Sequence, residues 1–298
     1  MKYFFTAFFS LISIHISAQM ISFTFDDGSV KDQPNYTFEE WNTMLLDKLE
    51  KADIEAMFFI NGKNKINEKG KKLLQSWNAR GHKIANHTFE HLNYSKDTHS
   101  FEAFKNDFIK NDSLINSYSN YVKFFRYPYL KEGNTEEKID SARTFLKSLN
   151  YRNGYVTIDA SDWYIDSRLC KRLKEDPNAD ISEYRAYYLD HLWRYAQFYE
   201  KIASELHGRH IKHTLLLHHN LSAALFIDDL IKMFKNKGWK IVPITEAYED
   251  SVYIQTPIFA GESLIYAQAI DTGEYDNTFR KPGEDSAYEK EKMAKLGL

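Results

Sequence analysis

The chain has 298 residues, of which 43% are hydrophobic and 27% are charged, a composition typical of a globular protein with a substantial core. Its formal net charge of −3 gives no electrostatic reason to expect binding to nucleic acid or to an anionic membrane. The only cysteine, Cys170, excludes an internal disulfide framework, and we interpret it as structural because it lies far from the charged motifs.

The first segment has the layout of a secretory signal peptide. Lys2 is followed by an apolar run over residues 3–14 and then by small residues that end at Ala18. The apolar run is shorter than a bilayer span requires. We therefore predict cleavage between Ala18 and Gln19, a secreted or periplasmic location in a bacterium, and no integral membrane segment after cleavage. The alternative is that this run forms the first buried element of the fold.

After residue 19, short β-type runs alternate with segments of helical periodicity. A capping box from Thr37 to Glu40 starts a helix that runs to about Lys51, and Gly81 and Gly238 each end a helix just before a strand. Such alternation predicts parallel strands with crossover helices, hence an α/β sheet or barrel. The predicted strands are residues 21–25, 56–60, 82–86, 122–125, 154–158, 214–217 and 240–243.

Two regions interrupt this alternation. Residues from about 164 to 212 form an insertion with a helix over about 181–206, whose aromatic stripe we expect to pack against the body. Residues 250–298 form a polar extension that either packs on the domain or trails from it.

Polar side chains follow the predicted strands at their C-terminal ends, where function collects in α/β folds. The first strand ends in Asp26 and Asp27, and the third ends in NHTFEH, which contains His87 and His91. The fourth, fifth and sixth end in RYPY, DASDW and LHH, whereas the second ends in Asn-Gly and the seventh in Pro-Ile-Thr. This distribution predicts a site at one edge of the sheet.

The two histidines suggest a metal site. On a helical turn, residues four apart lie on one face, so His87 and His91 would be able to bind one ion. Asp26 or Asp27 would be the third ligand, and two imidazoles with one carboxylate leave coordination positions open, as in catalytic sites. The alternative for such a histidine pair alone is a surface or core role.

The two adjacent aspartates can contribute to one site only if the backbone changes direction between them. Neighbouring strand residues point to opposite faces, so both carboxylates reach one site only if the chain turns, and Gly28 supplies that freedom. One carboxylate would then bind the ion, while the other takes a proton from a water whose pKa the ion lowers towards about 7. The simpler interpretation of Asp-Asp-Gly is a β-turn after a strand.

Taken in order, the motifs TFDDG, HTxxH, RYPY, DASDW and LLH resemble the polysaccharide deacetylases, the NodB homology group of carbohydrate esterase family 4, over residues 20 to about 245. The resemblance implies an α/β fold, a distorted and incomplete (β/α)7 barrel, which agrees with the seven predicted strands. It also implies a metal-dependent catalytic domain over residues 19–249, after the signal peptide at 1–18 and before the extension at 250–298. The insertion is longer than the family pattern leads us to expect.

The resemblance assigns roles residue by residue. Asp26 corresponds to the general base, and Asp27, His87 and His91 to the metal ligands. The cofactor it implies is a divalent metal, which the donor set suggests is Zn²⁺, with Co²⁺ and Ni²⁺ as alternatives. Arg126 corresponds to the partner that keeps Asp26 ionised.

The remaining motifs correspond to substrate-handling roles. Tyr129 would donate its backbone N–H to the oxyanion, and Pro128 would shape that turn.

His218 corresponds to the general acid, which Asp162 orients and keeps protonated, while Trp163 and Leu216 wall the acetyl pocket. Physical chemistry supports an acid independently, because an amine leaves a tetrahedral intermediate poorly unless it is protonated. The neighbouring His219 would stabilise the loop instead.

These roles predict a hydrolase whose partner is an acetylated oligo- or polysaccharide. Our main hypothesis is removal of N-acetyl groups from N-acetylglucosamine-type residues of peptidoglycan, chitin-like or other glycans. The alternatives are an O-acetyl esterase acting on xylan-type polymers and a non-catalytic, metal-containing glycan-binding protein. The insertion and the extension would restrict which glycans enter the cleft.

Overall fold

The computed structural model describes residues 18–63, 65–275, 283 and 285–298. The predicted signal peptide lies outside the described residues except for Ala18. Within the described part of the chain, one parallel sheet has seven strands in the order β5-β4-β3-β2-β1-β6, with β7 also paired to β1. The strands are β1 (Met20–Asp27), β2 (Met57–Ile60), β3 (Lys83–Asn86), β4 (Tyr121–Phe125), β5 (Arg152–Asn153), β6 (Lys212–His218) and β7 (Lys240–Ile241).

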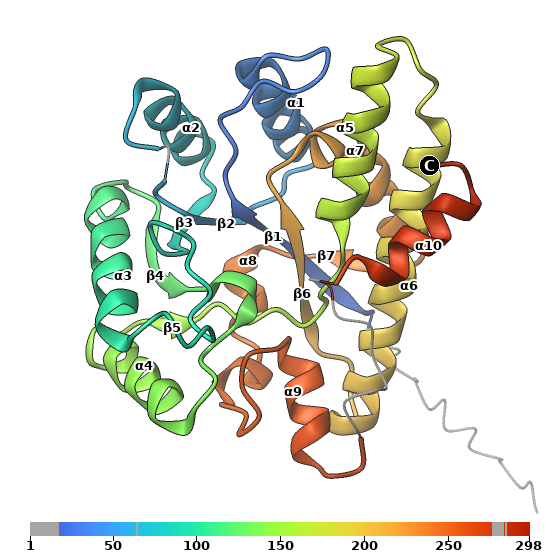
Figure 1. The fold of residues 1–298 in the computed structure, drawn as a ribbon. Coiled ribbons are helices and arrows are strands. Elements are labelled where there is room, and N and C mark those ends of the chain that lie inside the picture. Colours follow the sequence, from blue (N-terminus) through green and yellow to red (C-terminus); the bar gives the residue numbers. More distant parts are fainter. Residues whose placement is uncertain (1–17, 64, 276–282, 284) are drawn as a thin grey trace, which may run out of the picture.

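Helices surround this curled sheet, and the sheet does not close, because its two outer strands, β5 and β6, do not pair with each other (Figure 1). This arrangement confirms the predicted α/β class and the incomplete barrel. The helices are α1 (Phe38–Lys51), α2 (Glu68–Ala79), α3 (Phe101–Ile115), α4 (Glu136–Ser148), α5 (Asp162–Glu175), α6 (Ser182–His207), α7 (Leu221–Asn236), α8 (Ile244–Ala247), α9 (Leu264–Asp271) and α10 (Ala287–Lys295), with short 3-10 helices η1 (Pro128–Leu130) and η2 (Ser251–Ile254).

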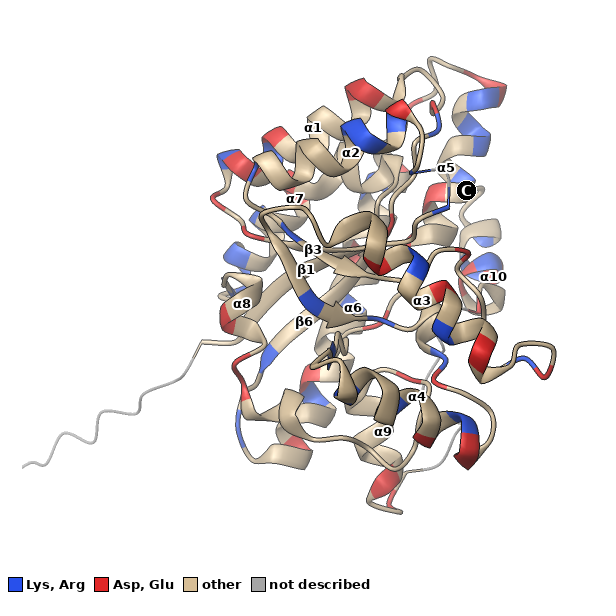
Figure 2. Cartoon of the chain, turned by 90° about the vertical axis from the view of Figure 1, so that its left-hand side faces the viewer, with Lys and Arg blue, Asp and Glu red and all other residues tan. Residues whose placement is uncertain are grey.

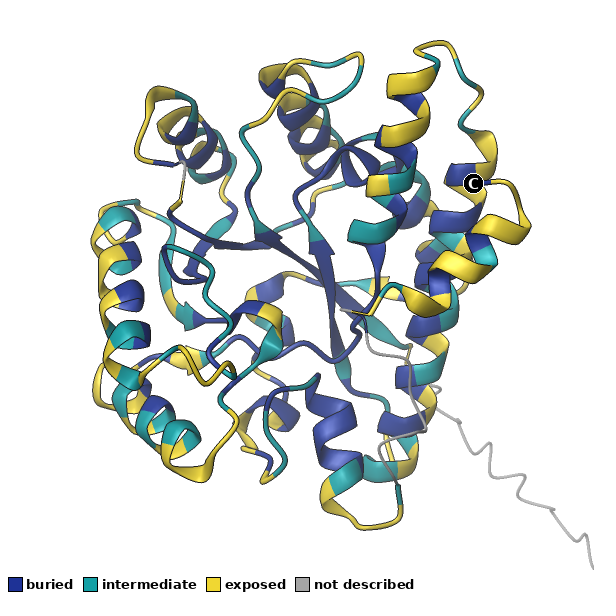
Figure 3. Ribbon diagram, viewed as in Figure 1, coloured by how far each residue is buried: buried dark blue, intermediate teal, exposed yellow. Residues whose placement is uncertain are grey.

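The strands form the centre of the core because their apolar side chains are covered on both faces. Phe23 and Phe25 of β1 and all of β2 are buried, whereas the helices expose their outer sides (Figure 3). Continuous apolar runs of this kind are typical of parallel strands flanked by helices. Acidic and basic residues are interspersed over the outer helices (Figure 2).

Local signals in the sequence explain where helices begin and end. The capping box of α1 is confirmed: Thr37 Oγ1 accepts the Glu40 N–H at 3.3 Å, and the Glu40 carboxylate accepts the Thr37 N–H at 2.8 Å. Gly81 and Gly238 have φ of +80° and +83°, which suits glycine after a helix. None of the helices within the described ranges has the combined length and apolarity that a bilayer span requires.

The predicted fifth strand is wrong in position. β5 contains only Arg152–Asn153, and Ile158 makes an isolated bridge to Leu215. The Gly154 N–H makes the last ladder bond, to the Phe125 carbonyl, and the pairing ends there because the Gly154 carbonyl accepts from the Arg126 side chain. The chain then crosses the open side of the barrel without a strand ladder.

The insertion contains two helices rather than the one that we predicted. α5 begins inside the DASDW motif, and α6 extends over Ser182–His207. The predicted packing of the α6 aromatic stripe is confirmed, since Tyr184, Tyr188 and Tyr195 are buried. The C-terminal extension contains α9, which is largely buried, and α10.

Candidate active site

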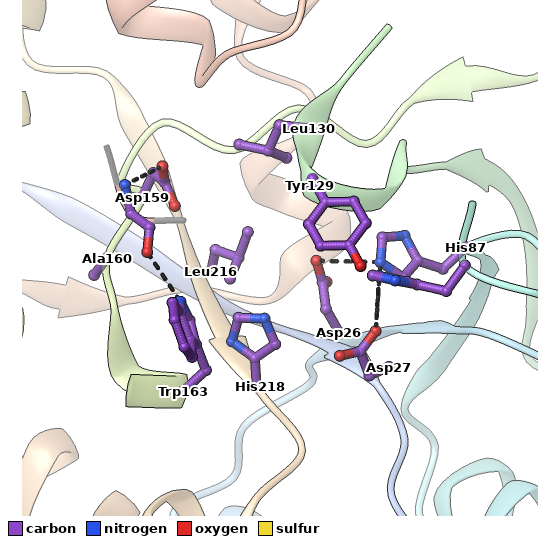
Figure 4. Close-up of a pocket in the computed structure, with 12 residues that line it drawn as sticks. Asp26, Asp27, His87, Tyr129, Leu130, Asp159, Ala160, Trp163, Leu216 and His218 are labelled. Carbon is purple, nitrogen blue, oxygen red and sulfur yellow. Dashed lines mark hydrogen bonds and ion pairs between the residues drawn. The ribbon is translucent and has the colours of Figure 1, made fainter. Parts of the chain in front are cut away.

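A cleft of about 380 Å³ opens at the C-terminal ends of the strands (Figure 4). The parallel register places Asp26 of β1 opposite His218 of β6, so the two halves of the predicted site start from neighbouring strands. Of the residues predicted from the sequence, the cleft is lined by Asp26, Asp27, His87, His91, Tyr129, Trp163, Leu216 and His218. Arg126 and Asp162 are fully buried and contact these residues from behind.

Asp27, His87 and His91 form a compact group whose ligand atoms all lie within 4.8 Å of one another. Asp27 Oδ1 is 3.1 Å from His91 Nε2 and 3.7 Å from His87 Nε2. A tetrahedral ion with bonds of about 2.0–2.1 Å separates its ligands by about 3.4 Å, which these distances bracket. The donor set and its spacing therefore fit a divalent metal.

The two histidines do not lie on a helical turn, so that part of the prediction is wrong. They lie in an irregular loop in which Thr88 and His91 both have φ of +59°. The loop is fixed instead by Asn86, whose side-chain oxygen accepts the Thr88 N–H at 2.9 Å.

His87 is oriented as a neutral ligand. Its Nδ1 lies 2.7 Å from the Arg126 carbonyl, which only accepts, so Nδ1 carries the proton and Nε2 keeps its lone pair towards Asp27. Burial and the neighbouring His91 lower the pKa of His87 well below its usual value. A metal therefore does not have to displace a proton from this imidazole.

Asp27 is turned out of the strand direction by its own backbone. Its φ is +75° and that of Gly28 is +82°, so the turn that we assigned to glycine begins one residue earlier. Burial alone would raise the pKa of Asp27, but the hydrogen bond and charge of His91, with the charges of His218 and His87, hold it well below its usual range. The carboxylate is thus ionised and ready to bind a cation.

Asp26 lies in a different environment from its neighbour. Arg126 Nη1 contacts Asp26 Oδ1 at 2.5 Å, while Asp26 Oδ2 faces the histidines at 3.9 Å from His87 Nε2. Burial raises the pKa of Asp26 more strongly than Arg126 lowers it, so the arginine moderates the shift rather than reversing it. A carboxylate of raised pKa is the better proton acceptor near neutral pH.

Arg126 is held rigidly in the barrel interior. Its Nε donates to the Gly154 carbonyl at 2.8 Å, and Nη1 also donates to Thr24 Oγ1 at 2.9 Å. The guanidinium carbon lies 3.9 Å from the centre of the Phe59 ring. The arginine therefore has little freedom to leave Asp26.

His218 lines the opposite side of the cleft, and Asp162 is buried behind it. Asp162 Oδ1 accepts from His218 Nδ1 at 2.7 Å, and Asp162 Oδ2 accepts the His218 backbone N–H at 2.9 Å and Asn220 Nδ2 at 3.1 Å. Burial alone would lower the pKa of His218, but Asp162, helped by Asp27 and Asp26, raises it to about 10. His218 is thus protonated over most of the pH range, with Nε2 available to the cleft.

The RYPY motif forms the rim. Pro128 opens η1, and Tyr129 has φ of +58° with its ring 4.6 Å from that of His91. Tyr129 is 47% exposed, which leaves this part of the rim open to solvent. On the other side, Trp163 Nε1 donates to the Gly283 carbonyl at 2.9 Å, so the indole stands as a wall beside Leu216.

Sequence reasoning missed residues that contact the candidate metal ligands or line the cleft. Asn61, from the Asn-Gly that ends the second strand, donates to Asp27 Oδ1 at 2.9 Å, and Lys65 donates to Asn61 Oδ1. The position of Asn61 at a strand end was a usable signal that we gave no weight. The cleft is also lined by Asp159 and Ala160, to which we gave no role although they belong to the DASDW motif, and by Leu130 and Gly283, which lie outside the motifs.

His219 has the structural role that we expected. Its Nδ1 accepts the Ser29 N–H at 3.1 Å, and its Nε2 donates to Asn42 Oδ1 at 3.0 Å. The ring packs against Trp41, with 4.3 Å between ring centres. Both nitrogens are therefore occupied away from the cleft.

The sequence matches the profile of the polysaccharide deacetylase family over residues 15–153. A peptidoglycan-N-acetylglucosamine deacetylase from Bacillus cereus is 29% identical over 144 residues, which is 48% of this chain and 46% of that protein. A bifunctional xylanase/deacetylase from Pseudobutyrivibrio xylanivorans is 32% identical over 121 residues, which is 39% of this chain and 18% of that protein. The chain thus spans less than half of each curated relative that it matches.

Solved structures share the fold. A peptidoglycan N-acetylglucosamine deacetylase superposes with a TM-score of 0.54 at 21% identity, covering 79% of this chain and 90% of that one. A pseudoenzyme of carbohydrate esterase family 4 from Bacillus anthracis superposes with a TM-score of 0.52 at 21% identity, covering 78% of this chain and 66% of that one. Residues 15–153 are thus similar to the polysaccharide deacetylase family, and the described part of the chain has the incomplete α/β barrel of these solved structures.

Proposed function

We propose that the protein is a secreted, metal-dependent deacetylase that hydrolyses N-acetyl groups of a glycan containing N-acetylglucosamine-type residues. The observation that carries this proposal is the presence of two acid–base pairs beside one three-ligand cluster. Asp26 is paired with Arg126, and His218 is paired with Asp162, and both pairs border the same cleft. The family match and the deacetylase relatives support the same reaction class.

The residues divide the reaction between them. The chemistry that a divalent cation supplies in such a site is a hydroxide-like nucleophile near neutral pH and a Lewis acid for the acetyl carbonyl. Asp26 takes the proton of the attacking water, and the backbone N–H of Tyr129 binds the developing oxyanion. His218 gives its proton to the leaving nitrogen, so water and the amide become acetate and a free amine.

A non-catalytic role is the main rival, because a protein of this fold has been described as a pseudoenzyme. A glycan-binding protein needs neither a rigid arginine beside Asp26 nor a carboxylate that keeps His218 protonated. Both partners are completely buried here, which is a costly arrangement to maintain without chemistry. The retained pairs therefore favour the enzyme.

Acetate release from a panel of acetylated glycans tests the proposal. The purified, Zn²⁺-loaded protein should release acetate from N-acetylated chitin or peptidoglycan fragments, with a free amine appearing in equal amount. Preferential release from acetylated xylan would establish the O-acetyl esterase instead. Binding to these glycans without acetate release from any of them would contradict the proposed catalysis.

We also infer that the mature protein begins near Gln19. The carbonyl of Gln19 accepts the Lys240 N–H at 2.8 Å, so the chain joins the fold directly after the predicted cleavage position. Sequencing the N-terminus of protein recovered from the periplasm or medium should give Gln19 first. Protein that retains residues 1–18 in the cytoplasm would contradict secretion.

A further inference from the structure

The acid side of the candidate site depends on a turn that lies beyond the last backbone pairing with the sheet. Residues 159–161 lead directly into Asp162, the partner of His218. Before this turn, β5 ends at Asn153, and the chain is bonded to β6 as far as Ile158, through the N–H groups of residues 157–158 to the Thr214 carbonyl and the bridge of Ile158 to Leu215. The turn lies on the open side of the barrel and after the segment that matches the family profile. Residues 159–161 themselves must therefore be held by contacts with parts of the chain other than the strands.

The side chain of His191, on α6, accepts a hydrogen bond from the backbone of this turn. The Ser161 N–H donates to His191 Nε2 at 3.0 Å, and both residues are completely buried. Because Nε2 accepts a hydrogen bond, the proton of the imidazole is on Nδ1. Nδ1 lies 3.4 Å from Glu289 Oε2 of α10, so this carboxylate sets the orientation of the ring.

Glu289 is fixed in turn on α6. Its side chain is fully buried and accepts a hydrogen bond from the Tyr187 hydroxyl, while Lys292 Nζ lies 3.4 Å from Glu289 Oε1. Burial alone would raise the pKa of Glu289, but His191, Tyr187 and Lys292 hold it well below its usual range. A buried carboxylate is costly unless it is answered in this way, so α10 is anchored on the side of α6 that carries His191.

A second contact joins the C-terminal extension to the same turn. Gly283 donates its N–H to Asp159 Oδ2 at 3.2 Å and accepts from Trp163 Nε1 at 2.9 Å. A Cβ at position 283 would lie 2.3 Å from Asp159 Oδ1, so the close approach requires glycine. The turn is therefore held on both sides of Asp162 by segments outside the family match.

We propose that His191 and Glu289 are positioning residues for the candidate general acid. They fix residues 159–161, so that Asp162 aligns His218 and Trp163 closes the acetyl pocket. The inference rests on the proposed function and extends it, because it gives the insertion and the C-terminal extension a part in protonating the leaving nitrogen. Neither residue contacts the cleft itself.

Two acetylated substrates distinguish a loss of acid positioning from a general loss of folded protein. An N-acetylglucosamine oligomer needs a proton on its leaving nitrogen, whereas an aryl acetate releases a phenolate that leaves unprotonated. We expect His191→Phe and Glu289→Gln to lower kcat on the oligomer about 10-fold to 100-fold while KM stays within about twofold. The aryl acetate rate should change by no more than about twofold.

Conservative and control variants complete the design. His191→Gln keeps an acceptor for the Ser161 N–H and should recover most of the oligomer activity. Tyr187→Phe removes a hydrogen bond to Glu289 but keeps its charge. This variant replaces Glu289→Gln in the experiment if Glu289→Gln does not fold. Asp250→Asn is the matched control, because it weakens the ion pair of the buried Asp250 with the exposed Arg209, which lies outside the turn. The ratio of the oligomer rate to the aryl acetate rate should stay that of the wild type.

The proposal and the proposed function fail in different ways. Equal losses on the oligomer and the aryl acetate, or no loss on either, would overturn the positioning role while acetate release by the wild type stands. Release from neither compound by the wild type would overturn the proposed function, and the inference with it.

Discussion

Asp26 and Asp27 are neighbours in sequence, yet their surroundings prepare them for different tasks. Burial raises the pKa of Asp26, while the imidazoles lower that of Asp27. Pairs of carboxylates whose pKa values are pushed apart are typical of sites that need one proton acceptor and one permanent anion. The backbone turn at Asp27 creates the difference by directing the two side chains into separate environments.

Asp26→Asn tests this division of roles. The substitution removes the proton acceptor but leaves Asp27, His87 and His91 unchanged, so kcat should fall by about 10²-fold to 10⁴-fold. Zn²⁺ affinity, measured by titration calorimetry, should remain close to that of the wild type. If Asp26→Asn loses Zn²⁺ and Asp27→Asn retains it, the two assignments are reversed.

Asp162→Asn tests the source of the His218 charge. Asp162 raises the pKa of His218 against the effect of burial, so its removal should lower that pKa from about 10. Because only protonated His218 donates a proton, the variant should lose activity at a lower pH than the wild type. A bound metal ion would reduce the effect of Asp27 on the pKa of His218 equally in the wild type and the variant. The expected direction of the pKa change is therefore the same with or without metal.

The measurement is the pH dependence of kcat on an N-acetylated oligomer. We expect the alkaline limb of the profile to move to lower pH in Asp162→Asn and the acidic limb to stay in place. An unchanged alkaline limb would show that another group supplies the proton.

The elements were predictable wherever local signals agree with the fold. The capping box at Thr37, the apolar runs and the glycine caps all act within a few residues, so they can be read from the sequence. The fifth strand could not be predicted, because its apolar pattern does not reveal that Arg126 binds the Gly154 carbonyl. The loop of His87 was mistaken for a helical turn, since a spacing of four residues also fits an irregular loop.

The junction between β6 and the C-terminal extension is predicted to contribute measurable stability. Asp250 accepts from Arg209 through both carboxylate oxygens, and also accepts the N–H groups of Lys212 and Val252. Burial alone would raise the pKa of Asp250, but Arg209 and these hydrogen bonds lower it to about 2. The carboxylate thus stabilises the folded state above its unfolded pKa of 3.8, and this contribution is lost as the pH falls towards about 2.

Urea unfolding of Asp250→Asn checks this expectation. Near neutral pH the variant should lose about 1–2 kcal/mol, and the difference from the wild type should shrink below about pH 4 and vanish only below about pH 2. Asp190→Asn, which removes an exposed partner of Arg194, should cost no more than about 0.5 kcal/mol. A pH-independent difference for Asp250→Asn would contradict the electrostatic origin.

In the molecule as a whole, the candidate site lies at one edge of the sheet, and segments of the insertion and of the C-terminal extension contact the turn that precedes Asp162. The motifs predicted the cleft residues because the carboxyl ends of parallel strands meet at one edge. The contact between His191 and Glu289 was not predictable, since it joins two helices that carry no motif. α9 is buried although the extension as a whole is polar, because a few apolar residues suffice to dock a short helix.

We propose that Asp27, His87 and His91 bind a divalent cation and that hydrolysis by the neighbouring residues depends on this ion. Acetate release from an N-acetylglucosamine oligomer should be measured before chelation, after removal of metal and after reloading with Zn²⁺. We predict that activity disappears on chelation and returns with stoichiometric Zn²⁺. Acetate release that persists at full rate in the metal-free protein would contradict the account.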